Sequence, residues 1–134
     1  MRLVPAPADH GVVFKHLAHK QGKNLIPALY DNVVDTRLCT VIANRHGARV
    51  GTIEHIMAAL RGMGVDNVLV EVDADEVPIM DGSSKPFVDA IQKTGLVEQA
   101  SPRRAIKILK TITVQEGDKS ITLSPSDVPV YAGR

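Results

Sequence analysis

The segment from Thr52 to Leu60 constrains the fold most, because its apolar residues have the spacing of a helix. They recur at intervals of three and four residues, at Ile53, Ile56, Met57 and Leu60. This spacing places them on one stripe, which we expect to face a core. The opposite side carries His55 and several small residues, which would let a second layer approach closely. These small residues are Ala58, Ala59 and Gly62. The helix is therefore predicted to be buried on both faces.

Glu54 and His55 are neighbours in the first turn of this helix, with Thr52 predicted as its N-cap. The positive end of the helix dipole favours a carboxylate and a neutral imidazole. A neutral imidazole can ligate a metal, and the adjacent carboxylate can take a proton from metal-bound water. In the alternative interpretation, Glu54 satisfies the dipole and His55 is a hydrogen-bonded core histidine. The residue types alone favour that alternative, because one histidine does not make a metal site.

The composition fits a single domain with an aliphatic core. The 134 residues are 44% hydrophobic and only 3% aromatic, and 16 Lys+Arg residues nearly balance 15 Asp+Glu. Neither a basic surface for nucleic acid nor a base-stacking platform is predicted. The single cysteine, Cys39, favours a reducing compartment. With no transmembrane-length apolar run and no signal segment after Met1, we expect a cytoplasmic protein.

Strand patterns surround the predicted helix. They cover residues 3–8, 11–17 and 25–30, a hairpin over 38–50, and residues 67–72. The last is almost continuously apolar and is predicted to be central, whereas Pro27 marks an edge segment. Strand, helix and strand in this order suggest a crossover unit. On the 11–17 strand and the loop after it, His16 and His19 should point to opposite faces, and both are expected at the surface. A further long strand over 105–115 and a hairpin turn at 116–119 follow.

A second helix is predicted after Asp81. Ser83 or Ser84 can cap it, Pro86 suits its first turn, and Gly95 follows its end. Asp81 has two interpretations. It can bind the backbone of its own turn, or it can lie at a site, since a capped helix start also suits an anion.

Five motifs along the chain occur in a family-like order and spacing. They are Pro5–Ala8, Asp31–Thr40, Thr52–Leu60, Val65–Asn67 and Pro78–Ser83. Together they resemble the UDP-3-O-acyl-N-acetylglucosamine deacetylases, the zinc enzymes of lipid A synthesis in Gram-negative bacteria. The resemblance runs from about residue 3 to about residue 118. It implies an α+β fold made of two similar domains, each a β-sheet with two helices on one face, of which this chain carries the first.

The resemblance also implies an activity and site residues. The family hydrolyses the N-acetyl group of UDP-3-O-acyl-N-acetylglucosamine, with Zn²⁺ polarising the amide carbonyl and activating water. By this resemblance His55 is a zinc ligand and Glu54 is the general base. Asp81 matches an aspartate that supports the site structurally. The residues that match a segment lining the mouth of the active site, and so binding substrate, are Leu38, Cys39 and Thr40.

The resemblance is incomplete. In the family the remaining zinc ligands come from a second domain, and this chain has no histidine after His55. Residues 1–118 are expected to form the first domain, incomplete at its start. Residues 119–134 are expected to be a strand end and the start of the connection to the missing second domain. The small-residue face with His55 would then be exposed. We expect the isolated chain to be inactive; alternatively, it is a truncated domain that only folds and associates.

Overall fold

The computed structural model describes residues 1–133. Its contacts separate two compact units, Met1–Ser101 and a second that begins at Pro102. The division expected at residue 118 rests on the family resemblance and stays a prediction, whereas compact packing of the first unit ends at Ser101.

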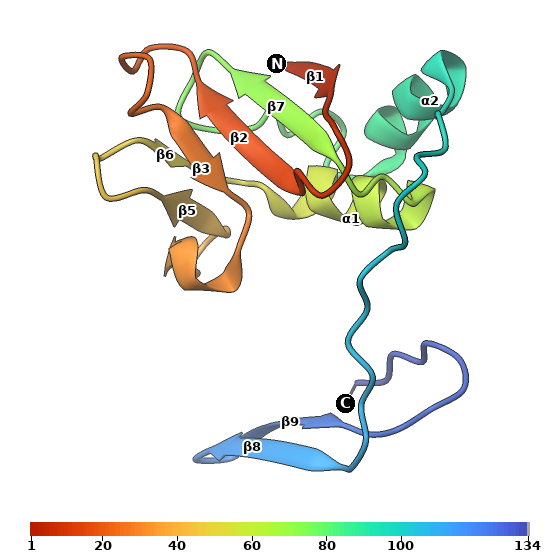
Figure 1. Ribbon diagram of the computed structural model, residues 1–134. Coiled ribbons are helices and arrows are strands. Elements are labelled where there is room, and N and C mark those ends of the chain that lie inside the picture. Colours follow the sequence, from red (N-terminus) through yellow and green to blue (C-terminus); the bar gives the residue numbers. More distant parts are fainter. Residues whose placement is uncertain (134) are drawn as a thin grey trace. The chain divides into compact units, whose positions relative to one another are not determined.

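The first unit is built on a four-stranded sheet with the order β1-β7-β2-β3 (Figure 1). Its strands are β1 (Arg2–Pro5), β2 (Val12–His16), β3 (Leu25–Pro27) and β7 (Val68–Val72). β7 pairs antiparallel with β1 and parallel with β2, so the apolar strand is central as predicted. β3 lies at the edge, which confirms the prediction from Pro27, a residue that cannot donate to a ladder.

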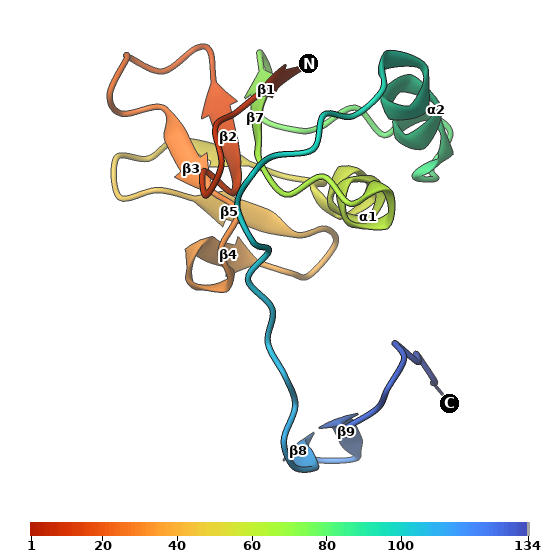
Figure 2. The ribbon, with the colours of Figure 1, turned by 45° about the vertical axis from the view of Figure 1, so that its right-hand side comes forward.

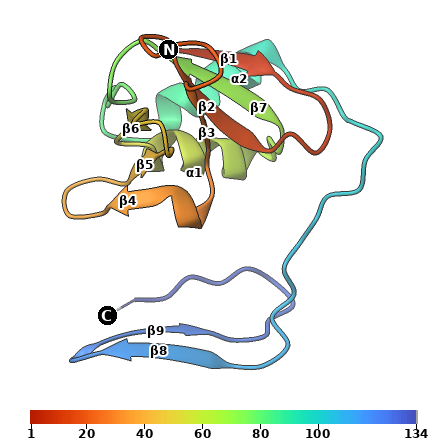
Figure 3. The same cartoon turned by 60° about the vertical axis from the view of Figure 1, so that its left-hand side comes forward.

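A second sheet of three short strands precedes the first helix (Figure 3). It consists of β4 (Val33–Asp35), β5 (Val41–Ala43) and β6 (Arg49–Val50), and the 3-10 helix η1 (Tyr30–Asn32) leads into β4. β5 and β6 form the predicted antiparallel hairpin. Asn44 closes its turn, because the side-chain oxygen accepts hydrogen bonds from the N–H groups of His46 and Ala48 at 2.9 and 3.2 Å.

Two helices, α1 (Glu54–Met63) and α2 (Lys85–Thr94), lie on one side of the four-stranded sheet (Figure 2). Along β7 every second residue is buried, so one face of the strand meets the helices. The shared core includes Phe14 and Val70 from the sheet, Ile56 and Leu60 from α1, and Phe87 from α2. The predicted α+β fold is therefore confirmed.

The two sides of α1 differ in exposure. Ile53, Ile56 and Leu60 are buried and Met57 packs at the edge of the core, which confirms the predicted stripe. Of the small residues assigned to the opposite side, Ala58 and Gly62 are exposed. Ala59 lies in the core instead, 1% exposed, because it is three residues from Ile56 and so shares its side of the helix.

The outer face of the sheet carries a row of charges across three strands. Glu71 of β7 is the register partner of both Arg2 on β1 and Lys15 on β2. Its carboxylate oxygens lie 2.9 Å from Arg2 Nη2 and 3.0 Å from Lys15 Nζ. The hydrogen bond from Lys15, together with the charges of both cations, lowers the pKa of Glu71.

The second unit contains a two-stranded hairpin of β8 (Ile112–Glu116) and β9 (Lys119–Leu123), turned at Gly117 and Asp118. The turn was predicted. The strand before it is shorter than expected and begins at Ile112, because the register ends where Ile112 faces Leu123. Ser124 and Pro125 follow, and a proline does not extend a strand of this kind.

Candidate active site

Glu54 and His55 are the first two residues of α1, as predicted, and both are half-buried. The backbone N–H of Thr40 donates a hydrogen bond to Glu54 Oε2 at 3.1 Å. Thr40 stands immediately before β5, so the hairpin sheet fixes the carboxylate at the helix start.

The three residues predicted at the mouth of the site differ in placement. Thr40 contacts Glu54 directly. Cys39 is half-buried, and its Sγ lies 3.5 Å from the point that a Cβ on Gly51 would occupy. Leu38 is fully exposed. Two of the three therefore lie against the segment that leads into α1, and Leu38 is an apolar side chain in solvent beside them.

The predicted N-cap is wrong. The N-cap of α1 is Ile53, which makes no side-chain capping bond, and Thr52 lies before it with φ of 56°. Thr52 is buried, and its hydroxyl donates to Glu76 Oε2 at 3.0 Å instead of capping the helix. A threonine before an apolar helical pattern is a good capping signal, but Glu76 is distant in sequence and competes for the hydroxyl.

The loop after β7 also binds the segment before α1 through the backbone. Gly51 N–H donates to the Asp75 carbonyl at 2.8 Å, and Val77 N–H donates to the Gly51 carbonyl at 3.0 Å. Sequence patterns did not reveal this pairing, because two hydrogen bonds leave no periodic signal. The start of α1 is thus held from two sides, by residues 39–40 and by residues 75–77.

Asp81 makes its hydrogen bonds within its own turn. Its Oδ1 accepts from the N–H and hydroxyl of Ser83, at 2.9 and 2.8 Å, and the residue is exposed. The hydroxyl and N–H of Ser83 lower the pKa of Asp81. This placement agrees with the interpretation in which Asp81 stabilises the turn before α2.

The expectation that His16 lies at the surface is wrong. Its side chain is buried, with Nε2 2.9 Å from Asp75 Oδ1 and Nδ1 accepting from Ala18 N–H at 3.3 Å. The ring also meets His19 edge-on, with centroids 4.8 Å apart. His16 shares a strand face with Phe14, two residues earlier, and that face meets the core. The prediction that His16 and His19 point to opposite faces is also wrong, because β2 ends at His16 and the turn after it brings His19 back to the His16 ring.

The described residues do not make a complete zinc site. Within residues 1–133, no group of three or more His, Cys, Asp or Glu side chains could hold a metal ion. A catalytic zinc normally takes three protein ligands, and His55 would supply one. The described residues therefore supply at most one of the ligands that a catalytic zinc takes.

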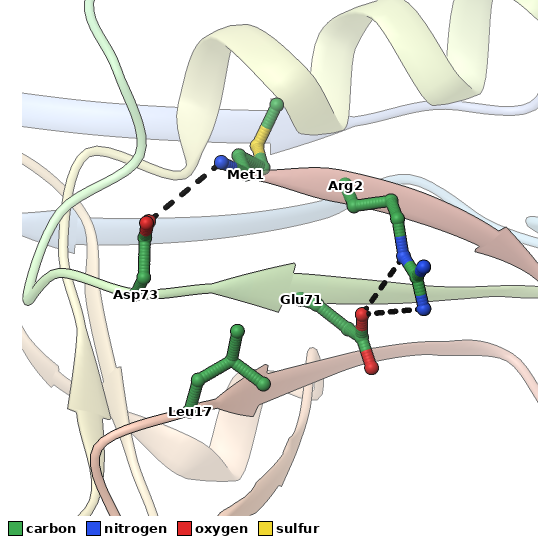
Figure 4. Close-up of a pocket in the computed structure, with 5 residues that line it drawn as sticks. All are labelled: Met1, Arg2, Leu17, Glu71 and Asp73. Carbon is green, nitrogen blue, oxygen red and sulfur yellow. Dashed lines mark hydrogen bonds and ion pairs between the residues drawn. The ribbon is translucent and has the colours of Figure 1, made fainter.

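A shallow hollow elsewhere on the first unit is lined by Met1, Arg2, Leu17, Glu71 and Asp73 (Figure 4). The Met1 amino group lies 3.7 Å from Asp73 Oδ1, and Arg2 pairs with Glu71. Its lining includes none of the predicted site residues, so it is separate from the candidate active site. Among residues 1–133, no helix has the length and apolar character needed to cross a membrane.

This is an α+β protein in which a potential acid–base carboxylate and a potential metal-ligating imidazole stand together at a helix start. The family model of the UDP-3-O-acyl N-acetylglycosamine deacetylases (LpxC) matches residues 1–132, and the chain belongs to this family.

Curated relatives agree with this assignment. A UDP-3-O-acyl-N-acetylglucosamine deacetylase of Pseudoalteromonas atlantica is 47% identical over 127 residues, covering 95% of this chain and 41% of the relative. The enzyme of the same name from Myxococcus xanthus is 49% identical over 126 residues, covering 94% and 40%. The one from Saccharophagus degradans is 46% identical over 145 residues, covering 100% and 47%. The chain thus spans less than half the length of these relatives.

Proposed function

We propose that this chain is the first domain of an enzyme that hydrolyses the N-acetyl group of UDP-3-O-acyl-N-acetylglucosamine in lipid A biosynthesis, in the cytoplasm. The observation that carries the proposal is the Glu54 carboxylate, fixed by Thr40 N–H beside His55 at the start of α1. The names of the relatives support the reaction and substrate.

Glu54 is proposed as the general base. Hydrolysis of an amide requires a water molecule to lose a proton as it attacks the carbonyl, and a positioned carboxylate accepts that proton. Thr40 N–H binds Oε2 and so orients the group, and Oε1 is proposed as the oxygen that accepts the proton. The same carboxyl group, once protonated, can pass the proton to the departing amine.

His55 is proposed as one ligand of a catalytic Zn²⁺. When bound, such an ion supplies Lewis-acid chemistry and a more acidic water. Its other ligands are proposed to lie in the part of the relatives that this chain does not cover. His55 occupies the first turn of α1, directly beside Glu54, so a metal held by its imidazole would lie next to the proposed base.

The segment Leu38-Cys39-Thr40 is proposed to contact the substrate. Thr40 reaches the Glu54 carboxylate, so the segment borders the reacting group. Leu38 is a fully exposed apolar residue, which suits contact with an acyl chain. Asp81 is proposed to support the site indirectly, by fixing the turn before α2.

A second candidate function is an inactive domain that only folds and associates. It is favoured by the missing three-ligand cluster within residues 1–133. For the same reason we propose that the 134-residue chain by itself releases no acetate at an enzyme-like rate. The two candidate functions predict different results when this chain is joined to the remaining segment of a relative: the first predicts deacetylase activity and the second predicts none.

The test is a chimaera in which this chain replaces the matching segment of the Pseudoalteromonas atlantica enzyme. Acetate release from UDP-3-O-acyl-N-acetylglucosamine should be restored in the chimaera and should fall at least about a hundredfold in Glu54→Gln and His55→Ala. Glu98→Ala, which removes an exposed glutamate outside the site, is the matched control. A folded chimaera without activity, or full activity in Glu54→Gln, would contradict the proposal.

A further inference from the structure

The backbone just before the candidate site has an unusual conformation. Thr52 has φ of 56°, in the left-handed region, and it is buried. A β-branched residue is disfavoured there because its branched Cβ crowds the adjacent carbonyl, and glycine is the usual occupant. Contacts from the surrounding structure must therefore hold Thr52 in this conformation. Strained backbone that is held in this way is concentrated at functional sites.

The group that holds Thr52 is Glu76. Its Oε2 accepts the Thr52 hydroxyl at 3.0 Å, and its Cγ lies 3.5 Å from where a Cβ on Gly51 would stand. A parallel bridge joins Gly51 and Glu76, flanked by the hydrogen bonds of Gly51 to Asp75 and Val77. Glu76 therefore contacts the Gly51–Thr52 junction, the two residues before the N-cap of α1, with both its backbone and its side chain.

This junction sets the direction in which α1 begins. Ile53 has no side-chain capping bond, so the hydroxyl of Thr52 is the nearest side-chain anchor on the chain before Glu54. On the other side of the junction, Thr40 N–H holds the Glu54 carboxylate itself. A change in the Thr52 turn would rotate the first turn of the helix relative to Thr40, and so move both Glu54 and His55.

We infer that Glu76 is a positioning residue for the Glu54–His55 pair and acts through the hydroxyl of Thr52. It does not touch the reacting atoms in this arrangement. The inference rests on the proposed function for the role of the pair, and on the contacts above for the positioning itself.

The first test uses the 134-residue chain and needs no turnover. In NMR spectra, Glu76→Ala and Thr52→Val should both shift the Thr40 amide and His55 ring signals by more than the Glu98→Ala control. Glu76→Gln, which keeps an oxygen acceptor for the hydroxyl, and Thr52→Ser, which keeps the donor, should leave those signals near their original positions. Unmoved Thr40 and His55 signals in folded Glu76→Ala and Thr52→Val would overturn the inference.

If Glu76→Ala and Thr52→Val both fail to fold, Glu76→Asp is the substitute. It keeps the charge but withdraws the acceptor by one methylene. It should then shift the same two signals, and their constancy would overturn the inference.

The second test uses the chimaera. Glu76→Ala should lower kcat about tenfold to a hundredfold with KM little changed, because a small displacement of a catalytic group costs that much. Glu76→Gln should restore most of the loss. A KM effect alone, or no rescue by Gln, would overturn the inference. An inactive parent chimaera would instead refute the proposed function, and the NMR result would still decide the positioning.

Discussion

Helix α2 begins with contacts made by its own turn, whereas α1 begins with contacts from distant parts of the first unit. Before α2, Asp81 binds Ser83, and Ser83 Oγ accepts from Lys85 N–H at 3.1 Å. Before α1, the partners are 14 residues apart for Thr40 and Glu54, and 24 apart for Thr52 and Glu76. The helix start that carries the candidate site is the one whose geometry depends on the folded unit.

The two helices differ at their starts but pack into the same core, so core truncations in either helix should have the largest effects. Ile56 of α1 is 0% exposed and Ile91 of α2 is 6% exposed in the same cluster. Ile56→Ala and Ile91→Ala should each destabilise the chain by about 2–5 kcal/mol, by loss of burial and cavity formation. Urea denaturation measures both. A loss below about 1 kcal/mol for either isoleucine would mean that its helix is not firmly packed in this core.

Glycine substitutions separate crowding from backbone strain. At Gly51 a Cβ would have neighbours at 3.5–3.6 Å, so alanine fits but the extra methyls of Gly51→Val should cost about 1–3 kcal/mol. Gly82, before α2, has open space but φ of 81°, so Gly82→Ala should cost about 1 kcal/mol through strain alone. Thermal unfolding of both variants measures this. If Gly51→Val did not lower stability, the side chains of Cys39, Val41 and Glu76 would not pack around Gly51 as the structure shows.

A double-mutant cycle measures the long-range contact at the start of α1. Thr52→Val combined with Glu76→Ala should show a coupling energy of about 0.5–1.5 kcal/mol, because the two side chains share one hydrogen bond. The cycle of Thr52→Val with Glu98→Ala should show coupling within about 0.3–0.5 kcal/mol of zero. Equal coupling in the two cycles would remove the distinction between the helix starts.

The smallest expected effect is a pH dependence at the start of α2. Hydrogen bonds from Ser83 favour the charged form of Asp81, so its folded-state pKa lies below the ordinary value of 3.8. The carboxylate then stabilises the folded state above pH 3.8, and this contribution is lost as the pH falls through the lower folded-state pKa. Melting temperatures of the chain and of Asp81→Asn should converge over that acid range. A constant difference at all pH values would contradict the assignment to Asp81.

The same contrast explains what sequence could predict. The start and end of α2 were predicted because Ser83, Pro86 and Gly95 act locally, whereas the side chain of Ser84 makes no capping bond. The stripe of α1 was predicted from apolar periodicity, and the central position of β7 from its nearly continuous apolar run. The Thr52 cap was wrong, since a distant carboxylate takes its hydroxyl. The burial of His16 was missed, because alternation separates two faces without showing which one meets the core.

For the candidate site, sequence placed Glu54 and His55 correctly in the first turn of α1, and of the residues that the resemblance added, Thr40 contacts Glu54. The hydrogen bond from Thr40 N–H is a tertiary detail that neither could supply. Nor did sequence indicate Glu76, because a single glutamate in a loop carries no pattern. The position of the candidate groups on α1 was therefore predictable, whereas the contacts that orient them were not, and their chemical roles stay predictions.

Zinc retained after exposure to a weak chelator tests the assignment of His55 most directly, measured on the 134-residue chain, the chimaera and their His55→Ala variants. We predict no bound zinc in the chain above the level of its His55→Ala variant. The chimaera should retain about one ion per molecule and lose it in His55→Ala. One zinc per 134-residue chain that is abolished by His55→Ala, or a chimaera whose zinc content is indifferent to His55, would contradict this account of the site.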